Sequence, residues 1–467
     1  MQMKARLEFW SVFIPLLLAM GIASFIPSLS AQPDIVEAPT SSVGGQVEYL
    51  DNGVVRIGVD LSIGGAITYF ADKKKGINMV NSHDWGRQIQ MSFYSGPKPF
   101  EPDGKKPKER WAGLGWNPIQ SGDVYGNRSK VIDFSNDGET LYVKCIPMHW
   151  PLDNQPGECT FETWIQLEGA TAKVRSRLNN HRGDSTQYRA RSQELPAVYT
   201  NGPWYRLITY KGPHPFSGDE LTEIPIKDKK PGEFPWSRFQ ATENWAALVD
   251  KDGHGLGVWN FGSSKFLGGF HGKPGKGGPK DGPTGYIAPL HDDILDHNIQ
   301  YEYSYRLIAG TIEEIRDFVY ENSPGPVTRF DFTSNRQHWI YENASDSGWP
   351  VRDGLRVKLD QDNPRLVSPL GCWNANEFPA ISITAAFRTK EKRAFLQWKP
   401  FDPEAETPNP IAFKIIPDGK LRVYTVELKG KPGYEGAIRQ YILLPSERGE
   451  TGNSIILRKF ELTIDSK

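Results

Sequence analysis

Short runs in which apolar and polar residues alternate, or in which β-branched and aromatic residues cluster, recur along this chain. Such runs are typical of β-strands. Turn clusters such as Asp51-Asn52-Gly53 and Asn136-Asp137-Gly138 separate them. In the first two thirds of the chain they predict strands at residues 54–60, 66–70, 88–94, 141–146, 160–167, 172–178, 246–249, 257–259 and 301–308.

Helical periodicity is confined to one convincing segment, residues 312–321. Thr311 precedes it as an N-cap, and Glu313 and Glu314 lie in the first turn, where the helix dipole favours negative charge. Ser323-Pro324-Gly325-Pro326 then interrupts the chain as a linker, and a second strand-rich block follows. We therefore expect an all-β protein with two domains, residues 46–322 and 327–467, joined at residues 323–326.

The N-terminus has the pattern of an export signal. Lys4 and Arg6 precede an apolar run over residues 9–23, and small residues lead to Ala31. We expect residues 1–31 to be a signal peptide cleaved after Ala31, residues 32–45 to be a flexible leader, and the mature protein to be secreted or periplasmic without a membrane span. An uncleaved anchor helix is the alternative.

Composition narrows the range of partners. The chain of 467 residues has a formal net charge of −1, which gives no electrostatic footprint for nucleic acid, and it is rich in Trp (14) and Tyr (18). Its three cysteines, Cys145, Cys159 and Cys372, form no zinc motif. Because Cys145 and Cys159 flank a segment that could fold back as a hairpin, they could form a disulfide in an oxidising compartment.

Residues 179–205 are unusually polar and aromatic for strands. Strands favour apolar residues on a buried face, so a stretch that mixes acids, bases, amides and aromatic rings indicates a wet, functional surface. Aromatic rings suit the C–H faces of a sugar, amides and guanidinium groups suit its hydroxyls, and carboxyl groups and histidine suit proton transfer. We therefore expect a polysaccharide or oligosaccharide as partner.

Several short motifs resemble known carbohydrate-active folds. Gly64-Gly65-Ala66-Ile67-Thr68-Tyr69-Phe70-Ala71-Asp72, Asn78-Met79-Val80-Asn81, the strand that ends in Asn180-His181, and the pair of segments 245–250 and 255–259 resemble the galactose-mutarotase-like super-β-sandwich. Phe330-Asp331-Phe332 and Gly433-Tyr434-Glu435-Gly436 resemble carbohydrate-binding jelly rolls appended to secreted enzymes. The resemblance implies a large super-β-sandwich followed by a C-terminal β-sandwich or jelly roll.

Five residues are catalytic candidates. The resemblance to mutarotases gives His181 the role of an acid, although Arg182-Gly183-Asp184 also suits a plain turn. Glu194 lies inside a predicted strand, where a carboxyl group needs a partner or a function; a structural ion pair is the alternative. The remaining candidates are Asp84, Asp123 and His149. For the two aspartates, turn chemistry is the alternative.

A second group is expected to bind the substrate. It consists of Arg87, Arg191, Tyr199, Trp204, Trp116 and His291. For the aromatic members, a place in the core is the competing interpretation. No metal site is predicted from motif spacing, but the acidic set Asp292, Asp293 and Asp296 could bind Ca²⁺ through oxygen ligands. The glycine-rich segment 270–285 is expected to be a mobile loop over a site.

Three functions are compatible with this sequence. The first is a secreted enzyme that degrades a polysaccharide, as a glycoside hydrolase with Glu194 and Asp84 or Asp123 as its carboxyl pair, or as a polysaccharide lyase. The second is a non-catalytic glycan-binding protein. The third is a sugar epimerase that uses His181.

Overall fold

The structure is a computed structural model that describes residues 46–228, 233–402 and 404–464. The predicted signal peptide lies outside these residues. The chain is all-β, as predicted, with one α-helix among the described residues. No helix in the described part of the chain is long and apolar enough to cross a membrane.

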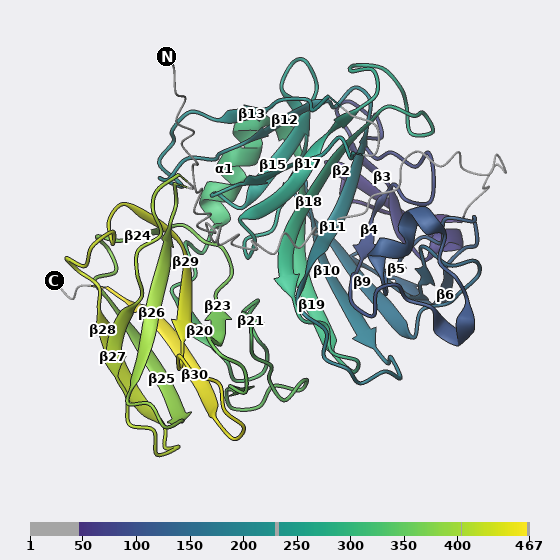
Figure 1. Ribbon diagram of the computed structural model, residues 1–467. Helices are drawn as coiled ribbons and strands as arrows, with labels where there is room; N and C mark the ends of the chain where they lie inside the picture. Colours follow the sequence, from purple (N-terminus) through teal and green to yellow (C-terminus); the bar gives the residue numbers. More distant parts are fainter. Residues whose placement is uncertain (1–45, 229–232, 403, 465–467) are drawn as a thin grey trace, which may run out of the picture.

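Strands that precede residue 312 form two large sheets (Figure 1). Sheet 1 runs in the order β1 (Val47–Asp51), β2 (Val55–Asp60), β3 (Ala66–Asp72), β4 (Ile89–Ser92), β11 (Arg191–Asn201), β18 (Thr284–Asp293), β17 (Lys265–His271) and β14 (Ser237–Gln240), with β5 (Pro118–Ile119) and β8 (Met148–His149) attached at β4. Sheet 2 runs in the order β13 (Thr222–Ile224), β12 (Arg206–Thr209), β15 (Trp245–Val249), β16 (His254–Trp259), β19 (Gln300–Thr311), β10 (Thr171–Asn180), β9 (Cys159–Glu168), β7 (Thr140–Ile146) and β6 (Lys130–Asn136).

The main core lies between sheets 1 and 2. Alternation along each strand turns one row of apolar side chains inward from each sheet, such as Phe70 and Ile287 from sheet 1 and Val174 and Leu307 from sheet 2. Helix α1 (Ile312–Asn322) covers the other face of sheet 2 with Ile315 and Val319. Its predicted cap is confirmed: Thr311 and Glu314 form a capping box.

The face of sheet 1 that points away from sheet 2 is called the open face here. It carries two smaller clusters, one that includes Trp85, Tyr94 and Trp111 and one that includes Tyr199 and Tyr286. Three short 3₁₀ turns, Leu61–Ile63, Pro102–Gly104 and Glu109–Leu114, lie in the loops of this half of the chain. The open face is thus aromatic and covered by loops.

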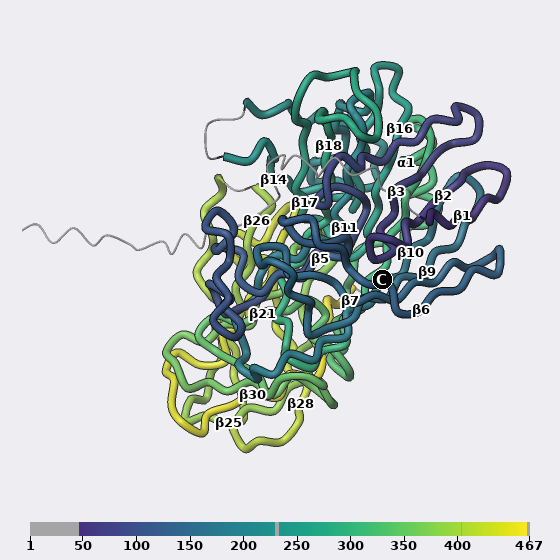
Figure 2. The backbone as a smooth tube through the Cα atoms, turned by 90° about the vertical axis from the view of Figure 1, so that its right-hand side faces the viewer, coloured from purple at the N-terminus to yellow at the C-terminus, as the bar shows by residue number. Residues whose placement is uncertain are grey.

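The C-terminal strands form a separate pair of sheets, grouped at the lower left of the molecule in Figure 1 and overlapping the N-terminal strands in the turned view of Figure 2. Sheet 3 contains β20 (Arg329–Asp331), β30 (Ser454–Thr463), β25 (Ala380–Arg388) and β28 (Arg422–Glu427), with β22 (Leu355–Lys358) beside β30. Sheet 4 contains β21 (Ile340–Glu342), β23 (Arg365–Val367), β29 (Ala437–Leu444), β26 (Arg393–Pro400) and β27 (Ile411–Lys414), with β24 (Trp373–Asn374) beside β29. Their core contains Trp339, Trp398 and Phe460.

The disulfide that the sequence left open is absent: Cys145 and Cys159 are both free and buried. The register of β7 and β9 explains the outcome, because Cys145 pairs with Phe161 and not with Cys159. Burial raises the pKa of both thiols. They pack as small apolar side chains in the main core.

Candidate functional site

The site is built on β4, whose alternation separates two kinds of residue. Ile89, Met91 and Phe93 point into the main core. The intervening residues therefore point to the open face; they are Gln88, Gln90, Ser92 and Tyr94. They are buried polar or phenolic side chains, joined by hydrogen bonds such as that from Ser92 Oγ to Tyr94 Oη at 2.9 Å.

Glu194 lies beside this row, on β11 in the middle of sheet 1. It pairs with Ser92 of β4 and with Leu290 of β18. The register of β11 shifts just after Glu194 on both sides, an irregularity typical of strands that aim a side chain at a site. Tyr94 Oη donates to Glu194 Oε2 at 3.1 Å. Glu194 Oε1 is buried and has no hydrogen-bond partner among the described residues.

Three aromatic side chains form a wall on the same face. The ring centroids of Tyr199 and Tyr286 are 4.7 Å apart, and those of Trp236 and Tyr286 are 5.1 Å apart. Tyr286 and Tyr199 come from neighbouring strands, whereas Trp236 immediately precedes β14. Together they offer flat surfaces of the kind on which a sugar ring stacks.

The environment of Glu194 changes its acidity. Burial raises its pKa from 4.5 to about 7, although the hydroxyls of Tyr94 and Tyr286 oppose the change, followed by the charge of Arg238. Desolvation penalises the charged form and outweighs the hydrogen bonds that stabilise it. Glu194 therefore exchanges its proton near neutral pH, as a general acid–base group requires.

Several polar atoms on the open face lack a partner among the described residues. Besides Glu194 Oε1, they include the indole nitrogens of Trp85, Trp111 and Trp236. Tyr286 Oη has no partner within ordinary hydrogen-bond geometry either, although it lies near enough to Glu194 to favour the charged carboxylate. A buried donor or acceptor without a partner costs free energy, so a group of them in one place calls for an explanation such as a ligand. Donors and one acceptor beside aromatic rings suit the hydroxyl groups of a sugar.

Asp84 and Arg87 lie at the end of this face, in the loop before β4. Arg87 Nε is 3.2 Å from Asp84 Oδ2, and both side chains are buried. Burial raises the pKa of Asp84, while the charge of Arg87 opposes the change. Their charges, like that of Glu194, act on Tyr199. The structure thus groups Glu194, Asp84, Arg87 and Tyr199 of the predicted residues.

The segment predicted as a mobile loop contacts the same end. Arg87 Nη1 donates to the Gly282 carbonyl oxygen at 2.7 Å, and the Ser82 amide donates to the Pro279 carbonyl oxygen at 2.7 Å. His83 Nδ1 is 2.7 Å from the Lys280 carbonyl oxygen. These contacts hold residues 279–283 against the Asp84 loop, so the segment closes one end of the face.

Trp116 and His149 form a second group around Glu158. His149 Nε2 is 2.8 Å from Glu158 Oε2, and Trp116 Nε1 donates to the same oxygen at 3.2 Å. His149 is fully buried, whereas a third of the Glu158 side chain is exposed. Although desolvation raises it, the pKa of Glu158 is lowered overall by His149 and Trp116.

Four predicted residues have other surroundings. Asp123 accepts from the amides of Tyr125, Asn127 and Asn154 and from the Asn127 side chain, which is the turn chemistry considered above. His181 follows β10 of sheet 2 and is exposed. Trp204 belongs to the main core. Arg191 Nη1 donates to the Ser95 carbonyl oxygen at 3.1 Å, and burial lowers its pKa.

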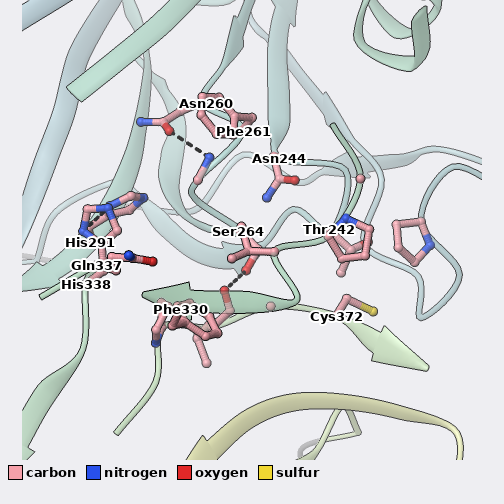
Figure 3. A pocket seen from close by; sticks show the side chains of 18 of the residues that line it. Thr242, Asn244, Asn260, Phe261, Ser264, His291, Phe330, Gln337, His338 and Cys372 are labelled. Carbon is pink, nitrogen blue, oxygen red and sulfur yellow. Dashed lines mark hydrogen bonds between the residues drawn. The ribbon is translucent and has the colours of Figure 1, made fainter. Parts of the chain in front are cut away.

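His291 lies on the opposite side of β18 from Leu290, at the junction with the C-terminal domain. Burial, then the charge of His338, lowers the pKa of His291 to about 3. His291 and His338 lie together at one side of a cavity of about 410 Å³ (Figure 3). Glu194 does not line this cavity.

The acidic set considered for Ca²⁺ does not form a common site in the described part of the chain. Asp292 pairs with Lys265 at 2.7 Å, Asp293 with His338 at 3.0 Å, and Asp296 with Arg336 at 2.7 Å. Each carboxylate therefore has a different cationic or histidine partner.

Sequence reasoning missed Tyr94, Tyr286, Trp236 and Glu158 as site residues. Tyr94 could have been identified from the sequence, because it ends the alternating row that begins at Gln88. Tyr286 was not, because Pro289 and Gly285 hide the strand pattern of β18. Trp236 and Glu158 lie outside recognisable motifs.

No family model matches the chain, and no curated protein matches it. Solved structures do match its fold. A galactose mutarotase-like protein from Lactobacillus casei is 12% identical over 56% of this chain and 99% of that one, with a TM-score of 0.37. A galactose mutarotase-like protein from Clostridium acetobutylicum is 10% identical over 56% and 95%, with a TM-score of 0.36. Likeness of this degree says nothing about activity or substrate.

A match to a larger protein covers a smaller part of its partner. The 4-alpha-glucanotransferase from Thermococcus litoralis is 10% identical over 57% of this chain and 38% of that one, with a TM-score of 0.31. The first two matches name the same kind of domain as the resemblance that the sequence motifs indicate.

Proposed function

We propose that this protein is a carbohydrate-active enzyme that degrades a polysaccharide on the open face of sheet 1, with Glu194 as its acid–base group. The observation that carries the proposal is the state of Glu194: buried, with a pKa of about 7, and with one carboxyl oxygen lacking a partner among the described residues. A carboxyl group held protonated near neutrality suits proton donation to a leaving group.

Two reactions fit this group. In hydrolysis, protonated Glu194 gives its proton to the glycosidic oxygen, and Asp84 is the second carboxyl group. In elimination, ionised Glu194 removes the proton beside a uronic carboxylate, the bond to the glycosidic oxygen breaks, and a neighbouring phenol such as Tyr94 donates a proton to the departing oxygen. In both, aromatic rings supply the stacking surface.

The position of His181 argues against the simplest epimerase. The resemblance to mutarotases gives this histidine the role of the acid, yet it follows a strand of sheet 2 and is exposed. Glu194 projects from sheet 1 toward the open face.

A substrate must reach Glu194, whose carboxyl group is buried. Glu194 is 2% exposed and Trp236 is 8% exposed, so a sugar ring reaches the carboxyl group only after covering side chains move. Movement of covering loops around a substrate is common in enzymes and excludes water from the reaction.

The test uses the full chain on a panel of neutral and uronic polysaccharides, with reducing ends and unsaturated uronates as readouts. Glu194→Gln should lower the rate about 10²- to 10⁴-fold, the usual range for loss of a general acid–base group. Glu223→Gln is the matched control, because Glu223 pairs with Arg206 on the exposed edge of sheet 2.

The products decide among the alternatives. Reducing ends without unsaturated products identify a hydrolase, and unsaturated products identify a lyase. Faster anomer exchange of free aldoses without cleavage would replace the proposal with an epimerase. Glycan binding that is the same in wild type and Glu194→Gln, with no product on any polymer, would leave a binding protein.

A further inference from the structure

A group of metal-ligand type lies at the junction of the domains, on the other side of β18 from the proposed active face. His291 and Asp293 are two residues apart on β18, so both project to the same face. His338 reaches them from the loop between β20 and β21. His338 Nδ1 is 2.8 Å from His291 Nδ1 and 3.0 Å from Asp293 Oδ1. Each residue offers one ligand atom, and these atoms lie within 4.8 Å of one another.

Hydrogen bonding alone accounts poorly for this convergence. A neutral imidazole Nδ1 carries one hydrogen at most. His338 Nδ1 faces the Nδ1 of His291, both oxygens of Asp293 and, at 3.5 Å, the Tyr301 hydroxyl. Tyr301 donates its own hydrogen to Asp293 Oδ2 at 2.6 Å. Several lone pairs therefore point to one small volume, which a cation would satisfy together.

The backbone holds His338 in place at a conformational cost. Gln337 and His338 both have left-handed backbone angles, with φ of 46° and 61°. This conformation costs a non-glycine residue roughly 1–2 kcal/mol. Gln337 is fixed by a bond from its side chain to the Asp331 carbonyl oxygen at 2.6 Å, and the neighbouring Arg336 pairs with Asp346 at 2.7 Å. Strain of this kind concentrates at functional sites.

The donor set selects the class of ion. Two imidazole nitrogens and one carboxylate suit Zn²⁺ and similar divalent transition ions, whereas Ca²⁺ prefers six or more oxygen ligands. Ligands about 2.0–2.2 Å from a tetrahedral zinc ion lie about 3.3–3.6 Å apart. The observed separations of 2.8 and 3.0 Å need only a small outward movement. Tyr301 is placed to orient the carboxylate from behind.

We propose that His291, Asp293 and His338 bind one divalent transition ion of the Zn²⁺ class at the domain junction. The three ligands leave a fourth tetrahedral position for water or an exogenous ligand. His338 lines both the cavity of about 410 Å³ shown in Figure 3 and a neighbouring one of about 300 Å³. The larger cavity also presents Asn244, Asn260 and Ser264.

The test titrates the metal-stripped full chain with Zn²⁺ by calorimetry and uses Co²⁺ absorption to report on coordination geometry. We expect about one ion per chain and a Co²⁺ spectrum of tetrahedral type. His338→Ala should weaken binding by more than about 10-fold, because loss of even an outer-shell partner of a ligand costs about 10- to 100-fold in affinity. His181→Ala is the control, because this exposed histidine lies outside the group.

Two results would overturn the proposal: no stoichiometric binding of either ion to the wild type, or equal binding by wild type and His338→Ala. Asp293→Asn keeps the size of the side chain and gives a second test if His338→Ala fails to fold. Circular dichroism on each variant separates loss of the fold from loss of the ligand. Neither readout depends on polysaccharide degradation.

Discussion

Two buried charged centres in this protein differ in how their charges are compensated. At the domain junction, Arg336 Nε and Nη2 each lie 2.7 Å from an oxygen of Asp346, and Nη2 lies 2.7 Å from Asp296. On the open face of sheet 1, Glu194 receives a hydrogen bond from the neutral hydroxyl of Tyr94. The first centre is an ion-pair network and the second is a carboxyl group among phenols.

The pKa values of Asp346 and Glu194 follow this difference in compensation. Although desolvation raises it, the pKa of Asp346 is lowered overall because Arg336 binds and neutralises it. Desolvation prevails at Glu194 and raises its pKa to about 7. Burial of a carboxyl group therefore produces a fixed charge where a cation accompanies it, and a proton-exchanging group where neutral donors do. We assign a structural role to the centre around Arg336 and an acid–base role to Glu194.

The largest expected effect is the loss of stability when Arg336, the cation of the structural centre, is replaced. Arg336→Met removes the cation but keeps an unbranched side chain, and leaves two buried carboxylates without compensation. It should lower the free energy of unfolding by about 3–5 kcal/mol, measured by urea denaturation. Arg329→Met is the control, because the pair of Arg329 and Asp331 is exposed and such pairs contribute little to stability. Equal losses in both variants would contradict the comparison.

The second prediction concerns Glu194, whose raised pKa makes the stability of the fold decrease as the pH rises. Because the pKa of Glu194 is about 7 in the folded chain and 4.5 ordinarily, the native state binds more protons between these values. The stability contributed by Glu194 is present below pH 4.5 and is lost as pH rises through about 7. The step from 4.5 to about 7 corresponds to about 3 kcal/mol.

Glu194→Gln removes this dependence. The free energy of unfolding of the wild type, relative to the variant, should fall by about 3 kcal/mol between pH 4.5 and pH 8. Denaturation curves collected across this range measure the difference, and Glu223→Gln gives the baseline for an exposed carboxyl group. Parallel wild-type and variant profiles would show that Glu194 titrates at its ordinary pKa. Glu194 would then have a structural role, like the centre around Arg336.

The sequence predicted the two centres unequally. Alternation over residues 88–94 and the cap at Thr311 are local patterns, so the strand and the helix followed directly. Glu194 was also recognisable, because a carboxyl group inside a strand conflicts with its surroundings. Its partners were not, because they depend on the order β4-β11-β18 and on the register shift after Glu194.

The residue pairs at the domain junction were harder to predict from the sequence than Glu194. Asp296 and Asp293 of the first block meet Arg336 and His338 of the second, and no local pattern encodes such pairs. The acidic set Asp292, Asp293 and Asp296 suggested one site, yet the alternation of β18 separates Asp292 from Asp293. Ligand geometry of this kind becomes visible only when the two domains are packed together.

The smallest expected effect sharpens the comparison by removing one neutral donor. The Tyr94 hydroxyl lowers the pKa of Glu194 through its hydrogen bond at 3.1 Å. Tyr94→Phe should therefore raise the midpoint of Glu194 titration by roughly one pH unit, as expected for loss of one hydrogen bond to a charged group. The pH dependence of stability, referred to Glu194→Gln, measures this midpoint without a substrate. Tyr142→Phe is the matched control, because Tyr142 donates to Glu162 on sheet 2 at 2.9 Å. A midpoint that moves equally in both variants, or in neither, would mean that burial alone sets the acidity of Glu194 and that the phenols of the open face only fill space.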